Sequence, residues 1–112
     1  MAKYERHVKG SFSQINSRLK SAVTNSGASV NLVDSTFLKI GETSVNVSVY
    51  DKYYMRNSNR ASLTLTVAGD ENDVYVSAIG AGGGSGAVFN FSWGAESDFV
   101  ETVINAMRGM GY

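Results

Sequence analysis

The sequence predicts an α+β fold, a two-layer sandwich in which an antiparallel sheet of about five or six strands carries two helices on one face. Apolar residues recur at helical spacing in one segment near each end of the chain, and between these segments they alternate with polar residues. The length of 112 residues is that of one domain. We therefore expect a single α+β domain over residues 1–112, with the order β-α-β-β-β-β-(β)-α.

The chain opens with a short alternating segment, Lys3–Lys9, which predicts a strand whose charges suit the edge of a sheet. Gly10 ends this strand. Ser11 is placed to cap a helix, and Gln14 completes a capping box. The apolar stripe of that helix consists of Phe12, Ile15, Leu19, Ala22 and Val23. Gly27 marks its end.

The next segment predicts a strand from Ala28 to Leu32 that fades near Asp34. A separate apolar stretch, Phe37–Ile40, ends at Gly41. Alternation then becomes regular from Thr43 to Val67, which predicts a long β-hairpin. Its turn is expected at Arg56–Arg60.

The first arm of this hairpin has a valine face and a polar face. We expect the helices to cover the valines, and the polar face to meet water, a ligand or another subunit. The valine face holds Val45, Val47 and Val49, and the polar face holds Ser44, Asn46, Ser48 and Tyr50.

Beyond a turn at Gly69–Asp73, the pattern predicts a strand at Val74–Ile79, a glycine-rich segment at Gly80–Gly86 and one more strand at 87–93. The last helix follows Gly94, with acidic residues in its first turn, where the helix dipole favours them. Its apolar stripe consists of Phe99, Val100, Val103, Ile104 and Met107.

Composition excludes several classes of function. Ten basic and ten acidic residues give zero net charge, against the basic excess typical of nucleic-acid binding. The chain has no cysteine, which excludes disulfides and thiolate catalysis. No apolar stretch approaches the ~20 residues of a membrane span, and the first residues do not form a signal peptide. We therefore expect a cytoplasmic protein with no cofactor, metal, nucleic-acid or membrane partner.

The glycine-rich segment is the first candidate ligand site. Its backbone amides would contact an anion or another ligand through Gly82, Gly83, Gly84 and Ser85. No lysine follows and the next segment predicts a strand, so the pattern of a phosphate-binding loop is missing. A plain connection between strands is the favoured interpretation.

Asp51 and Tyr53 form the second candidate, because alternation places both on the valine side of their strand. A carboxylate there needs a partner, such as Arg6, or a pocket. The favoured alternative is a bulge or strand end that releases Asp51 to solvent. The single histidine, His7, lacks a neighbouring nucleophile and is expected at the surface.

A cluster of aromatic residues near the predicted turn is a candidate interface, because Tyr, Met and Arg are enriched at interfaces. The cluster consists of Tyr50, Tyr54, Met55 and Arg56. The alternative is that these aromatic side chains cover an edge of the core.

The chain resembles a family of short bacterial proteins, mainly Gram-positive, that is classed as a domain of unknown function. The resemblance lies in residues 1–7 with Gly10 and Phe12, in Val76–Ile79, in the glycine-rich segment and in 87–89 and 93–96. It implies a bacterial, cytoplasmic, single-domain protein and transfers no catalytic role.

Three functions remain as hypotheses. The leading one is a non-enzymatic module that binds a protein partner or forms a homo-oligomer. The alternative is a carrier of a small apolar ligand, held between the last helix and the sheet as in helix-grip domains, whose order of elements is similar. The third is an enzyme that works through residues such as Asp51 and Tyr53.

Overall fold

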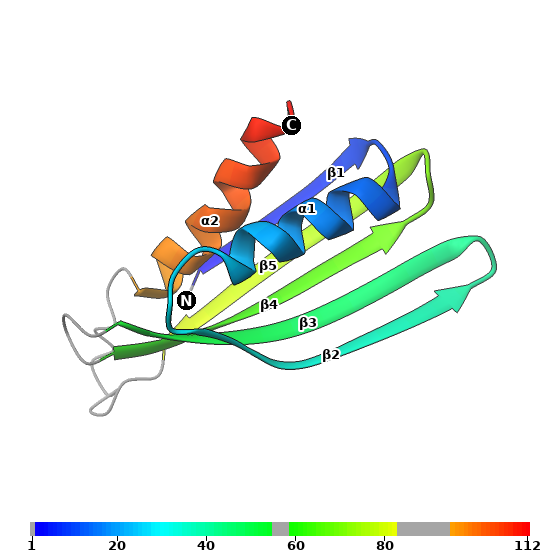
Figure 1. Cartoon of the computed structure of the whole chain (residues 1–112). Coiled ribbons are helices and arrows are strands. Elements are labelled where there is room, and N and C mark those ends of the chain that lie inside the picture. The colour runs from blue at the N-terminus through cyan, green and yellow to red at the C-terminus, as the bar shows by residue number, and fades with distance from the viewer. Residues whose placement is uncertain (1, 55–58, 83–94) are drawn as a thin grey trace.

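A computed structural model describes residues 2–54, 59–82 and 95–112. Five antiparallel strands form one sheet in the order β1-β5-β4-β3-β2. Helices α1 and α2 pack side by side on one face of this sheet (Figure 1). The predicted α+β class and the order β-α-β-β-β-β-α are confirmed. The strand predicted at 87–93 lies outside the described residues.

The elements span β1 Ala2–Lys9, α1 Phe12–Thr24, β2 Val30–Ile40, β3 Thr43–Tyr54, β4 Asn59–Gly69, β5 Asp73–Gly82 and α2 Ala95–Gly109. Two local predictions were wrong. The strand expected to fade at Asp34 is continuous through a β-bulge between Leu32 and Asp34. The glycine-rich segment does not leave the sheet at Gly80, because β5 continues to Gly82 and pairs with β4.

Helix α1 begins as its sequence predicts. The Ser11 hydroxyl accepts a hydrogen bond from the Gln14 amide at 3.3 Å. Its buried stripe consists of Phe12, Ile15, Leu19 and Val23, and that of α2 consists of Ala95, Phe99, Val100, Val103 and Met107. Each stripe packs against the sheet, and burial of about 1.5–3 kcal/mol per large side chain makes these contacts the main source of stability.

The sheet presents to the helices the face of β3 that was expected to meet solvent. Tyr50 pairs with Leu63 and Ser48 with Leu65, and all four side chains are buried. The valines of β3 pair instead with Thr64, Thr66 and Ala68 on the opposite face, which neither α1 nor α2 covers. The prediction that the helices cover the valine face was therefore wrong.

Hydrogen bonds explain why a polar face of β3 is tolerated in the core. The Asn46 amide donates to the Thr36 carbonyl at 2.8 Å and to the Ser35 hydroxyl at 3.3 Å. The Ser35 and Ser48 hydroxyls lie 3.0 Å apart. Buried polar groups cost little free energy when they are hydrogen-bonded. Because β2 supplies these hydrogen bonds, the polar side chains of β3 can lie in the core.

Candidate functional site

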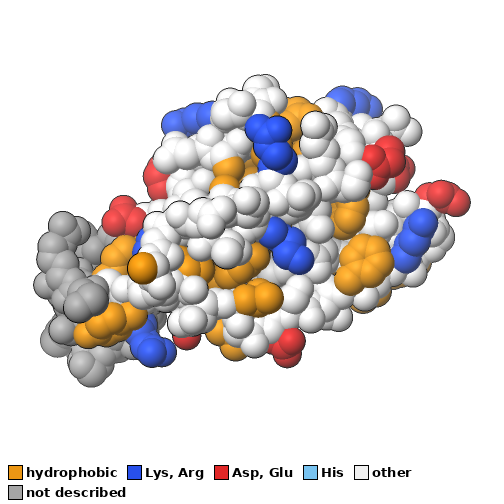
Figure 2. Space-filling model, viewed as in Figure 1, with side chains coloured by type: hydrophobic (Ala, Val, Ile, Leu, Met, Phe, Trp, Pro, Cys, Tyr) orange, Lys and Arg blue, Asp and Glu red, His pale blue; other side chains and the backbone are white. Residues whose placement is uncertain are grey.

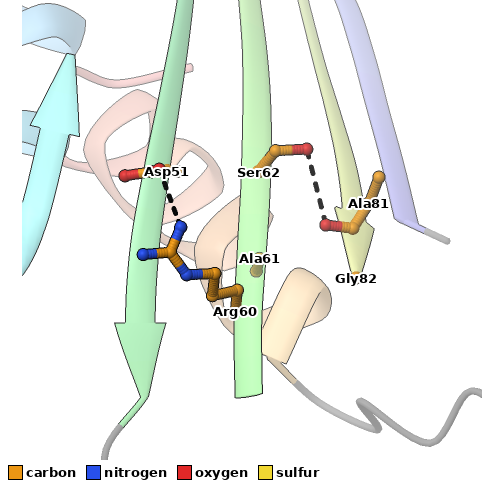
Figure 3. Close-up of a pocket in the computed structure, with 6 residues that line it drawn as sticks. All are labelled: Asp51, Arg60, Ala61, Ser62, Ala81 and Gly82. Carbon is orange, nitrogen blue, oxygen red and sulfur yellow. Dashed lines mark hydrogen bonds and ion pairs between the residues drawn. The ribbon is translucent and has the colours of Figure 1, made fainter. Parts of the chain in front are cut away.

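The first candidate site is a pocket at the ends of three central strands, with a volume of about 220 Å³. Figure 3 shows the six residues that line it: Asp51, Arg60, Ala61, Ser62, Ala81 and Gly82. It brings together two residues predicted from the sequence, Asp51 of β3 and Gly82 of β5. Gly83, Gly84 and Ser85 lie outside the described residues.

Electrostatics in this pocket are largely compensated. The Arg60 Nη1 atom lies 3.5 Å from Asp51 Oδ2 across the β3–β4 pair. Asn31 donates to the other carboxylate oxygen of Asp51 at 3.3 Å. The Ser62 hydroxyl is directed to the Ala81 carbonyl at 3.5 Å. The six described lining residues therefore offer polar contacts to a small molecule, and they present neither an uncompensated charge nor an acid–base pair.

Asp51 reaches solvent for a reason different from the one expected. Its strand has no bulge against β4, and Asp51 lies on the valine side as alternation predicts. That side is the uncovered face of the sheet, so the carboxylate needs no burial. The suggested partner Arg6 pairs with Val76 on β5, far from β3 in the strand order, and Arg60 takes its place.

The three tyrosines near the predicted turn, Tyr50, Tyr53 and Tyr54, are divided between the two faces of β3. Tyr50 is 1% exposed and contacts the core, so it was wrongly predicted to lie in an interface. Burial raises its pKa, while hydrogen bonds with Thr24 and Ser48 act in the opposite direction. Tyr53 is 39% exposed on the uncovered face. Met55 and Arg56 lie outside the described residues.

Tyr54 covers an edge of the core, which is the alternative considered for this cluster. The Lys52 ammonium lies 4.9 Å from the centre of its ring and donates to the Ser26 carbonyl at 3.2 Å. The Tyr54 hydroxyl is buried without a hydrogen-bond partner among the described residues. This burial, reinforced by the negative charge of Asp98, raises its pKa to about 12.

The second candidate site is strand β2, which the sequence did not single out. Of the eight large hydrophobic side chains that are exposed among the described residues, five lie on this strand: Leu32 at 53%, Val33 at 59%, Phe37 at 59%, Leu38 at 43% and Ile40 at 69%. In the view of Figure 2, hydrophobic patches lie along the part of the molecule where Figure 1 places β2 and β3. In the sequence, the exposed side chains of β2 correspond only to an apolar stretch without regular alternation.

The β2 side chains stay exposed because α1 contacts only part of this strand on one face, and the other face is not covered by either helix. Figure 1 shows α1 above β4 and β5, with the β2–β3 hairpin projecting beyond it. Phe12 at the start of α1 contacts Phe37, with the two ring centres 6.3 Å apart. On the uncovered face, Leu38 and Ile40 lie beside Val45 and Thr43. Strand β2 is therefore apolar toward both faces of the sheet.

The single histidine and the features expected to be absent, a metal site and a membrane span, complete the survey of the described residues. His7 is an exposed residue of β1, 3.6 Å from the Asp73 carboxylate. Within residues 2–54, 59–82 and 95–112, no three acidic or histidine side chains come together as metal ligands would. No helix in these ranges is long and apolar enough to cross a membrane.

Fold and site together define a small α+β sheet protein with an open, apolar edge strand. The chain belongs to a family of unknown function, DUF6054, whose model matches residues 1–111. This confirms the resemblance to such a family. No curated protein matches the chain. A solved structure, that of TTHA0849 from Thermus thermophilus, is similar over 94% of this chain and 92% of its own, at 8% identity and a TM-score of 0.35.

Proposed function

We propose that this protein is a non-enzymatic interaction module of the bacterial cytoplasm that binds a protein partner through strand β2. The observation that carries this proposal is the concentration of exposed large hydrophobic side chains on one edge strand. Contiguous apolar surface of this kind marks interaction sites in soluble proteins. An edge strand also offers unpaired backbone groups, which bind an added strand.

The chemistry of the pocket supports a binding function better than catalysis. Among the described lining residues the one carboxylate, that of Asp51, is engaged by Arg60 and Asn31, and the Ser62 hydroxyl is directed to a backbone carbonyl. General acid–base catalysis needs a group that titrates near neutrality beside a reacting atom. None of the described pocket residues presents one. The cytoplasmic location is supported by the absence of cysteine.

Site-specific photocrosslinking in the native host tests this proposal. A benzophenone amino acid replaces Phe37 on β2 or, as a matched control, Glu5 on the opposite edge strand. We expect a crosslinked adduct, with its partner peptide identified by mass spectrometry, from position 37 and not from position 5. Addition of Leu38→Lys to the position-37 variant should abolish the adduct. Equal adducts from both positions, or none from either, would contradict the proposal.

A further inference from the structure

The two edges of the same sheet are built differently. Edge strand β1 has eight residues, of which Lys3, Glu5, Arg6, His7 and Lys9 are charged or ionisable. Charged side chains along an edge oppose pairing with another chain. Edge strand β2 has eleven residues and only two charges, Asp34 and Lys39. Among the described strands, one edge is thus protected by charge and the other edge is not.

The open edge includes a regular stretch, residues 34–40, which we name the open-edge segment. Beyond the bulge, every residue of this segment pairs in sequence with β3, from Asp34 opposite Val49 to Ile40 opposite Thr43. In an antiparallel edge strand, alternate residues direct their N–H and C=O groups away from the sheet. Such a row of groups is matched by another β-strand, because only a strand repeats donors and acceptors at the same spacing.

We propose that the occupant of this edge is the open-edge segment of a second copy of the chain, in an antiparallel pairing that joins two sheets into one. This inference rests on the proposed function and names its partner. A twofold axis perpendicular to the sheet generates such a dimer, since it reverses strand direction and keeps each face on its own side.

The open-edge segment carries no net charge that opposes its pairing with a second copy, and it presents apolar side chains on both faces. Asp34 and Lys39 cancel, so two copies approach without net repulsion. Asp34 pairs with Val49 on the uncovered face and Lys39 pairs with Ser44 on the helix side, so antiparallel alignment brings no like charges together. On the uncovered face, Leu38 of one copy then lies beside the other copy's central residues, next to the valines of β3. On the helix side, the two Phe37 rings approach each other.

The size of the contact indicates a reversible dimer. Half-exposed side chains of this size, with the paired backbone, would bury on the order of 1,000 Å² in total, the lower limit for a specific interface. The dimer should therefore dissociate on dilution. This gives the proposal a measurable concentration dependence.

Sedimentation velocity over a dilution series tests the pairing. The samples are the wild-type chain, Leu38→Lys, Leu38→Glu, an equimolar mixture of these two variants, and Ile79→Lys as control. Ile79 is 38% exposed on β5, so the control makes a similar change on the uncovered face but away from the edge. Circular dichroism melting confirms that each variant is folded.

We expect the wild type and the control to shift from monomer to dimer as concentration rises. Each Leu38 variant should weaken dimerisation by about tenfold or more through like-charge repulsion, and the mixture should restore it. The inference is overturned by a wild-type monomer at all concentrations, by unaffected Leu38 variants, by a mixture that stays monomeric, or by equal loss in the control. A wild-type monomer that still crosslinks from position 37 to another protein would remove this inference and leave the proposed function standing.

Discussion

At the residue scale, Tyr54 shows how burial changes the chemistry of one side chain. Its hydroxyl has no partner among the described residues, and its pKa is raised from 10.0 to about 12, by burial first and by Asp98 second. The folded protein therefore holds this proton more tightly than the unfolded chain does. The contribution of the protonated Tyr54 hydroxyl to the free energy of unfolding is fully present below pH 10 and is lost as the pH rises toward 12.

Substitution Tyr54→Phe tests this account. Removal of an unpaired buried hydroxyl should leave stability at pH 7 unchanged or increase it by up to about 1 kcal/mol. Above pH 10 the variant should lose stability less steeply than the wild type. Chemical denaturation at pH 7, 10 and 11 gives both quantities, with Tyr53→Phe as the exposed control. A loss of more than about 1 kcal/mol at pH 7 would show that the hydroxyl is paired after all.

At the element scale, the start of α1 is held by a loop distant in sequence. The Glu71 carboxylate accepts hydrogen bonds from the Ser11 hydroxyl, from the Ser13 hydroxyl at 3.1 Å and from the Ser13 amide at 3.3 Å. The Ser11 bond is the main cause of the lowered pKa of Glu71. The sequence predicted the Ser11 cap but not this second one, because residue 71 reaches it only through the sheet.

Substitution Glu71→Gln should lower the melting temperature at pH 7. Because the folded pKa lies below the ordinary value of 4.5, this stabilisation is present at neutral pH and is lost as the pH falls through the folded pKa. The difference between wild type and variant should therefore shrink on acidification. Melting curves at pH 7 and pH 3 measure it, and Glu42→Gln is the control in a neighbouring turn. A constant difference at both pH values would argue against the carboxylate cap.

Helix α2 approaches strand β5 closely at Gly80. A Cβ atom there would lie 2.7 Å from the Glu96 carbonyl oxygen and 2.9 Å from Val100 Cγ2. The helix therefore packs on a position without a side chain, and the close approach requires a glycine there.

Substitution Gly80→Ala should cost about 1–3 kcal/mol, because the helix must shift to admit the methyl group. Gly109→Ala is the matched control, since a Cβ at Gly109 meets nothing within 4 Å. This control should be neutral or slightly stabilising. Urea denaturation of both variants measures the difference. Equal stabilities would show that α2 does not pack on Gly80.

At the scale of the whole molecule, the order and type of elements were predictable because each depends on local periodicity and capping. The orientation of β3 was not. Valines and polar residues alternate cleanly along β3, so the pattern alone does not tell which face the helices cover. That face is decided by the register with β4, where Tyr50 pairs with Leu63. The open edge was missed for a similar reason. That Phe37 stays exposed depends on how far α1 extends over the sheet, and that Leu38 stays exposed depends on which face of the sheet the helices cover.

The candidate pocket was predictable only in part. Asp51 drew notice as a carboxylate among apolar neighbours, and Gly82 as part of a glycine-rich segment. Arg60 and Asn31 come from separate strands, and only the β2–β3 and β3–β4 registers bring them to Asp51. A single sequence contains no signal for such a pairing.

The central claim is that β2 is the edge through which this protein binds a partner, and amide hydrogen exchange tests it most directly. Exchange is followed by mass spectrometry at low and high protein concentration, with peptides that cover β2 and, as internal control, β1. We predict that the open-edge segment becomes more protected at high concentration while β1 does not change. Equal exchange of both edges at every concentration, also in extracts of the native host, would contradict the account.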